Sequence, residues 1–136
     1  MNSAKVKLTA FLTGLILILL SCEKEVPTVI TTEITGITAS FVTLGGIVTD
    51  EGFGPVTERG VCLSSMNDYP TINDFRTIDG TGAGAFISYI ENLDSETTYF
   101  VRAYATNSTG TGYGEHLSFT TPLFFCDPPN PWIVKK

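Results

Sequence analysis

The chain has 136 residues and carries 14 Asp and Glu against 8 Lys and Arg, a formal net charge of −6. A chain of this length argues for one domain with accessory segments. Affinity for nucleic acid rests on clustered Lys and Arg, and no basic stripe follows residue 25, so the composition argues against a nucleic-acid partner.

An apolar run near the N-terminus predicts export. Lys5 and Lys7 precede an apolar segment, residues 8–20. A membrane-spanning helix needs about 20 apolar residues, so this segment is too short to remain as a span and fits the core of a secretory signal peptide. The run ends in Leu19-Leu20-Ser21-Cys22, which resembles the lipobox of bacterial lipoproteins. The alternative is an ordinary signal peptide with a coincidental Cys.

The lipobox resemblance implies a signal peptide over residues 1–21 and a lipidated tether over residues 22–26. In that family the Cys, here Cys22, receives a thioether-linked diacylglycerol, and its new amine is acylated after cleavage. Several acyl chains, at about 0.8 kcal/mol per buried CH₂, attach a protein lastingly where one holds it only marginally. The resemblance therefore implies a partner membrane, the outer membrane, with the protein on its periplasmic or outer face. Residues 23–25 read equally well as a solvated tether or as an export tag like those of surface lipoproteins.

The rest of the chain reads as short strands. β-branched and aromatic residues recur in runs separated by Gly, Pro, Asn and Asp, with no helical period. The expected strands cover residues 27–32, 37–49, 56–64, 85–93, 97–107 and 113–121, with a short edge strand near 75–78. The inward-facing side chains are expected to include Val42, Leu44, Val48, Phe86, Ile90, Tyr99, Val101, Ala103, Ala105, Leu117 and Phe119. Seven short strands with regular turns predict an antiparallel β-sandwich.

One segment carries a family resemblance. "ENLDSETTYFVRAYATNSTGTGYGEHLSFTT", residues 91–121, resembles the last two strands of a fibronectin type III domain, in which a Leu, a short turn and T-x-Y introduce the penultimate strand. Leu93 and Tyr99 match, so the resemblance implies a fibronectin type III/immunoglobulin-like sandwich over residues 27–121. It also implies a tyrosine corner, in which the Tyr99 hydroxyl bonds backbone a few residues upstream. The only Trp, Trp132, lies in the tail rather than in the early strands, which departs from the family.

Two further stretches, "VTERGVCLSS" and "LGGIVTDEG", resemble repeats found in lipoproteins of Gram-negative gut anaerobes. No arrangement of residues predicts catalysis. His116 is the only histidine and is expected to face outward on the last strand, and the Cys and His spacing does not match a zinc site. The "GTGAG" at residues 80–84 leads into a strand, whereas a phosphate loop needs a helix N-terminus. The sequence therefore predicts no enzyme, no metal site and no cofactor.

An outward row on the strand at residues 97–107 is the candidate binding site. Phe100, Arg102 and Tyr104 alternate with the inward residues, and exposed aromatic side chains beside Arg are typical of binding hot spots. This row would serve a protein or glycan partner. The alternative is cross-strand packing against Glu58 or Arg59, which stabilises a sheet by about 0.2–1 kcal/mol per pair.

Cys62 and Cys126 leave two possibilities open. In an oxidising compartment they could form a disulfide that ties the tail to the sandwich. Alternatively, Cys62 is a buried free thiol, which behaves as a small apolar side chain. Residues flanking Cys62 are apolar on both sides, so alternation does not say which face it occupies.

The tail, residues 122–136, is rich in Pro and too short to fold alone. It either packs Phe124, Phe125 and Trp132 on the domain or begins a downstream domain. Taken together, the sequence predicts a non-enzymatic membrane-anchored lipoprotein whose sandwich acts as a spacer, scaffold or adhesion module. The alternative is a glycan- or protein-binding accessory lipoprotein that uses the outward aromatic row.

Overall fold

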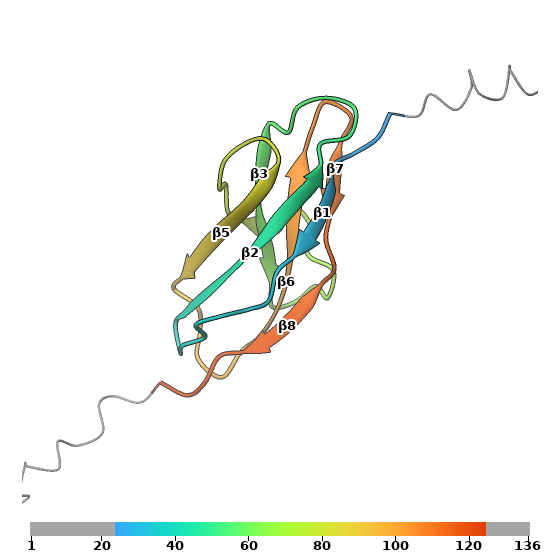
Figure 1. Ribbon diagram of the computed structural model, residues 1–136. Helices are drawn as coiled ribbons and strands as arrows, with labels where there is room; N and C mark the ends of the chain where they lie inside the picture. Colours follow the sequence, from blue (N-terminus) through green and yellow to red (C-terminus); the bar gives the residue numbers. More distant parts are fainter. Residues whose placement is uncertain (1–23, 125–136) are drawn as a thin grey trace, which may run out of the picture.

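The computed structural model describes residues 24–124 (Figure 1). The expected leader, the lipid site Cys22, Cys126 and residues 125–136 lie outside this range. Eight strands form, namely β1 (Thr28–Thr31), β2 (Phe41–Asp50), β3 (Glu58–Ser64), β4 (Phe75–Arg76), β5 (Gly84–Glu91), β6 (Thr98–Thr106), β7 (Thr111–Tyr113) and β8 (Leu117–Thr120). Within residues 24–124, no helix is long and apolar enough to cross a membrane.

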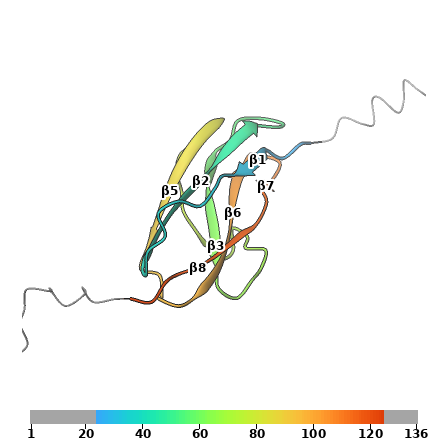
Figure 2. The same cartoon turned by 60° about the horizontal axis from the view of Figure 1, so that its bottom comes forward.

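The strands form two antiparallel sheets that face one another (Figures 1 and 2). The first sheet has the order β1-β2-β5, and the second has the order β4-β3-β6-β7, with β8 also paired to β6. The connections β2–β3, β4–β5 and β5–β6 cross from one sheet to the other, as in a β-sandwich. The expected all-β sandwich is confirmed.

Alternating side chains build the core between the sheets. The inward residues expected on β2, β5 and β6 are buried, and Phe119 of β8 joins them, with Leu117 packed at the margin. Burial of one such aliphatic or aromatic side chain contributes about 1.5–3 kcal/mol, which fixes the register of each strand. Gly46 is the inward position of β2 that faces the centre. A Cβ there would lie 2.6 Å from the Cβ of Ala103 and 2.7 Å from Cζ of Phe86, so only glycine lets β2 approach β6 this closely.

The last expected strand is not continuous. Residues 114–116 separate β7 from β8, although both strands pair with β6. The hydroxyl of Thr31 occupies the gap, where it accepts the Ala103 N–H (3.0 Å) and donates to the Glu115 carbonyl (2.6 Å). A side chain from the first strand thus replaces ladder hydrogen bonds, and this is why the structure has eight strands where the sequence predicted seven.

The chain enters and leaves the sandwich at opposite ends (Figure 1). At the N-terminal end, the Glu25 carbonyl accepts the Phe53 N–H and an Asn107 side-chain N–H, both at 2.9 Å. At the C-terminal end, Thr121 donates its N–H to Thr97 (3.0 Å) and its hydroxyl to the Asp94 carbonyl. Loops at both ends therefore hold the chain where it joins the domain.

Candidate functional site

Residues 65–80 cover the outer face of the second sheet, where the sequence predicted the row of exposed side chains. After the β4 pairing, the chain continues beside β3, so that the Thr77 N–H donates to Val61 O (2.9 Å) and the Asp79 N–H to Arg59 O (2.7 Å). Pro70, in the preceding loop, is fully buried. This segment adds a covering layer outside the sandwich core.

Tyr104 lies beneath this layer and is 0% exposed. Its hydroxyl is 2.7 Å from Glu58 Oε1 and 2.6 Å from the Thr77 carbonyl, and Arg76 pairs with the same Glu58 oxygen at 2.8 Å. Burial raises the pKa of Tyr104, and the hydrogen bond from Tyr104 is the main cause that lowers the pKa of Glu58. The expectation that Tyr104 faces solvent is wrong, because the segment that follows β3 covers it and supplies the Thr77 carbonyl as an acceptor for its hydroxyl. Tyr104 therefore cannot contact a ligand directly.

Arg102 is outward-facing, as expected, but its guanidinium is occupied within the domain. It lies over the Tyr113 ring, 4.0 Å from the centroid, and its Nε donates to the Pro70 carbonyl. The Tyr113 hydroxyl in turn accepts the Ile72 N–H at 3.2 Å. A cation–π contact contributes about 0.5–2 kcal/mol, depending on desolvation. Arg102 thus holds the covering loop against the sheet.

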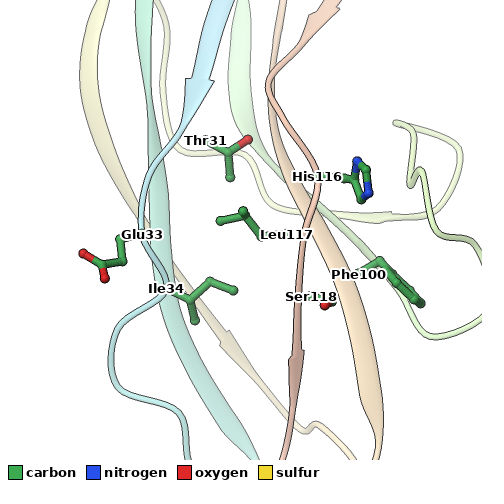
Figure 3. Close-up of a pocket in the computed structure, with 7 residues that line it drawn as sticks. All are labelled: Thr31, Glu33, Ile34, Phe100, His116, Leu117 and Ser118. Atoms are coloured by element: carbon green, nitrogen blue, oxygen red, sulfur yellow. The ribbon is translucent and has the colours of Figure 1, made fainter.

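Phe100 is the member of the row that reaches an open groove (Figure 3). The groove has a volume of about 700 Å³ and lies where the segment after β1 passes the start of β8. Its walls are formed by Thr31, Glu33, Ile34, Phe100, His116, Leu117 and Ser118. The Glu33 carboxylate points away from the His116 ring on the other side of the groove (Figure 3), and that ring packs on Tyr69 with centroids 4.3 Å apart. These two titratable side chains do not converge, so the groove is better suited to binding by shape than to acid–base chemistry.

An exposed apolar surface lies instead on the outer face of the first sheet. Ile87 is 61% and Tyr89 64% exposed, and the Tyr89 ring stacks near-parallel with that of Phe41 (centroids 6.2 Å apart, 19° between planes). Strand register places Ile30 opposite Ile47 on the same sheet. We call the surface formed by Ile30, Phe41, Ile47, Ile87 and Tyr89 the β2–β5 face. Exposed apolar side chains that gather on one face of a sheet are typical of interaction sites.

Sequence reasoning missed the β2–β5 face, although β5 carries a signal for it. Its residues 86–90 are apolar at outward as well as inward positions, with a serine, Ser88, at one inward position. Ser88 is fully buried and bonds the Asp79 carboxylate and the Thr77 hydroxyl. This polar contact ties β5 to the segment beside β3. The only histidine in the sequence, His116, lines the groove described above and takes no part in this contact.

The Leu93–Tyr99 pair lies at the C-terminal end of the sandwich. Leu93 and Tyr99 are both buried, and the Asp94 N–H donates to the Tyr99 hydroxyl at 3.0 Å. The Tyr99 ring stacks on Phe119, with centroids 5.6 Å apart. The corner therefore joins the β5–β6 connection to both β6 and β8.

Cys62 lies on the outer face of β3, opposite Arg102 in the register, and is 0% exposed beneath the covering segment. Desolvation raises the pKa of its thiol to about 12. Its proposed partner Cys126 lies outside residues 24–124, so a disulfide between them stays a hypothesis. No group of three His, Cys, Asp or Glu side chains within the described range is placed to hold a metal ion.

Comparisons with known proteins support the fold of this chain but do not indicate its function. No protein-family model matches the sequence, and no curated protein matches it. Among solved structures, the fibronectin type III domain of human KIAA0970 protein is similar over 80% of this chain and 83% of that chain, with 16% identity and a TM-score of 0.52. The sensor domain of the anti-sigma factor RsgI4 from Pseudobacteroides cellulosolvens is similar over 75% of this chain and 100% of that chain, with 14% identity and a TM-score of 0.52.

Domains A168–A170 of titin are also similar, with 17% identity and a TM-score of 0.51 over 73% of this chain. This chain spans about a third of that titin chain, 33% of its length. At these identities the likeness concerns backbone architecture alone. The chain therefore has a fibronectin type III/immunoglobulin-like sandwich fold.

Proposed function

We propose that this chain is a lipid-anchored envelope protein whose fibronectin type III-like domain acts as a non-catalytic spacer or scaffold. The observation that carries the proposal is that the chain enters and leaves the sandwich at opposite ends (Figure 1). The attachment point and any segment that follows Phe124 would then be separated by the whole length of the domain.

The predicted tether is short, which matters for this role. Glu25, whose carbonyl is held by Phe53 and Asn107, lies three positions after Cys22. Three extended residues span at most about 11 Å. A lipid on Cys22 would therefore keep the N-terminal end of the sandwich close to the membrane and direct its other end away.

The anchor is tested by labelling cells with radioactive palmitate and measuring the mass of the mature N-terminus. We expect label in the natural sequence and in Cys126→Ala, and none in Cys22→Ala. Label that persists in Cys22→Ala, or a mature form without acyl mass, would contradict the anchor.

The spacer geometry is tested by energy transfer from a labelled residue to a dye in the membrane. The lipidated protein is placed in vesicles as single-cysteine-labelled variants, Phe53→Cys at the N-terminal end and Phe124→Cys at the C-terminal end, both exposed positions and both with Cys126→Ser. Transfer falls steeply with distance, so we expect it to be markedly weaker from position 124 than from position 53. Equal energy transfer from the two positions would contradict the spacer proposal but would not contradict the proposed lipid anchor.

The β2–β5 face favours a second candidate function, a protein- or glycan-binding accessory. Its exposed aromatic ring, Tyr89, belongs to the residue type enriched at binding hot spots. Residues 24–136 would be used in glycan arrays and protein pull-downs, with Tyr89→Ala as the test variant and Tyr69→Ala, exposed outside this face, as the control. Capture that Tyr89→Ala abolishes and Tyr69→Ala retains would support this function. Capture unchanged by Tyr89→Ala would remove it.

A further inference from the structure

An apolar pocket opens at the C-terminal end of the sandwich. It has a volume of about 310 Å³ and is lined by Leu63, Phe75, Ile90, Glu91, Asn92, Leu93 and Tyr99. Leu63, Ile90, Leu93 and Tyr99 belong to the buried core, whereas Phe75 is 55% exposed on the two-residue edge strand β4. Most of this lining is apolar, and Glu91 and Asn92 bring polar groups to it.

The chain leaves the domain beside this pocket. Thr121 is hydrogen-bonded to Thr97 and to the Asp94 carbonyl, and these two residues are close neighbours of Tyr99 and Leu93 in the lining. Twelve residues of the sequence, 125–136, follow Phe124. A segment of that length reaches about 40 Å when extended. The stretch from Phe124 to Trp132 by itself can span up to about 29 Å. The tail is therefore long enough to return to the pocket.

Charge favours the tail over a second copy of the domain. Residues 24–124 contain 4 Lys and Arg against 12 Asp and Glu, a net charge of −8. The arginines are engaged internally, since Arg76 pairs with Glu58, Arg102 holds the covering loop, and Arg59 donates to the carbonyls of Gly82 and Ala83. At the pocket, Glu91 is exposed, as are Asp94 and Glu96 in the adjoining turn. Two such acidic ends repel each other, whereas an apolar segment that carries lysines is complementary to this one.

The tail contains such a segment, Trp132-Ile133-Val134-Lys135-Lys136. We propose that residues 125–136 fold back on the domain and place the indole of Trp132 in the pocket, with Lys135 and Lys136 against the acidic rim. The indole is a large apolar body with one N–H donor, which suits an apolar pocket that has carboxylate and amide groups in its lining. Three prolines, Pro128, Pro129 and Pro131, restrict the connecting stretch, so ordering it costs less entropy than ordering a flexible linker.

Trp132 is the only tryptophan, so its fluorescence reports its own surroundings. The protein tested is residues 24–136, which retains both sheets and every contact described above. We expect emission at shorter wavelength than from an indole in water, and a several-fold lower acrylamide quenching constant. Both should be independent of protein concentration.

Two variants test the location. Phe75→Ala removes an exposed wall of the pocket and Glu91→Lys reverses the charge at its rim, and both are expected to shift the emission to longer wavelength and raise quenching. Phe53→Ala, exposed at the opposite end of the sandwich, is the matched control and should leave the emission unchanged. Thermal melts of each variant verify that the sandwich still unfolds cooperatively.

Three results would overturn the proposal. A water-exposed Trp132 in the natural sequence shows that the tail does not dock. A buried Trp132 that neither pocket variant moves shows that it docks elsewhere. Burial that disappears on dilution, with a dimer seen by size-exclusion chromatography, makes a second copy the occupant. None of these results bears on the lipid anchor, because the protein used carries no lipid.

Discussion

The hydroxyl of Tyr104 lies 2.7 Å from Oε1 of Glu58 and is held beneath a chain segment that begins after β3. The two residues lie on neighbouring strands, with Glu58 at the start of β3 and Tyr104 near the end of β6. The outer face of the second sheet is therefore a second packed layer, with a buried aromatic hydroxyl, a carboxylate and an arginine, rather than a bare surface.

Removal of the Tyr104 hydroxyl should destabilise the domain. In Tyr104→Phe, the Thr77 carbonyl and Glu58 lose the single O–H donor that they share, and an unsatisfied partly buried acceptor costs about 1–3 kcal/mol. We expect the urea midpoint to fall correspondingly. The control is Tyr89→Phe, at a ring that is mostly exposed, for which we expect no change. Equal midpoints for Tyr104→Phe and the natural sequence would contradict the role of this hydroxyl.

Glu58 should make stability depend on pH. Its pKa is lowered in the folded domain, first by the hydrogen bond from Tyr104 and also by Arg76, so the folded state binds fewer protons than the unfolded state as the pH approaches the ordinary value of 4.5. The stabilisation that its charge provides is fully present above 4.5 and is lost as the pH falls from there through the lowered pKa.

Urea midpoints of the natural sequence and of Glu58→Gln, measured from about pH 7 to about pH 3, provide the check. The natural sequence should be the more stable protein at neutral pH, and the difference should shrink with acid. A difference that grows as the pH falls would show that the sign is wrong.

The positions of the strands could be predicted because alternation is local. Each of β2, β5 and β6 carries its own inward set, and burial of that set decides the register whatever the rest of the chain does. The division of the last strand could not be predicted in this way. It depends on Thr31, which lies 84 residues before Glu115 and 72 before Ala103, and the local sequence around residues 114–116 does not predict that contact.

The candidate site shows the same limit. The alternation of residues correctly predicted that Arg102 and Tyr104 lie on the outer face of the sheet. It does not predict which segment of the chain covers that face. The cover comes from residues 65–80, which read as a polar loop with a short edge strand. For β5 the opposite error occurred, because an exposed apolar face was overlooked. A serine, Ser88, occupies a buried inward position there, while the outward positions Ile87 and Tyr89 are apolar and exposed.

Loss of the Tyr99 hydroxyl should have a smaller effect than loss of the Tyr104 hydroxyl. In Tyr99→Phe, the Asp94 N–H loses its acceptor, but Asp94 is exposed, so water can replace the hydroxyl. The core ring remains stacked on Phe119, and we expect a cost of about 0.5–1.5 kcal/mol. Thermal or urea unfolding measures it, with Tyr69→Phe as a surface control. A loss larger than that of Tyr104→Phe would show that the corner holds the two sheets together more than its single bond suggests.

Cys62 should resist alkylation until the covering segment opens. In residues 24–136 with Cys126→Ser, Cys62 is the only thiol, it is fully buried, and its pKa of about 12 leaves on the order of one molecule in ten thousand as thiolate at pH 8. We expect iodoacetamide to react with it far more slowly in the folded protein than in urea, with a rate that rises as urea increases. The folded protein that retains Cys126 provides the comparison: a mass lower by two hydrogens would show that Cys62 and Cys126 have formed a disulfide. Rapid alkylation of Cys62 without denaturant would contradict its enclosure, because the reagent would then reach a thiol that residues 65–80 are meant to exclude from water.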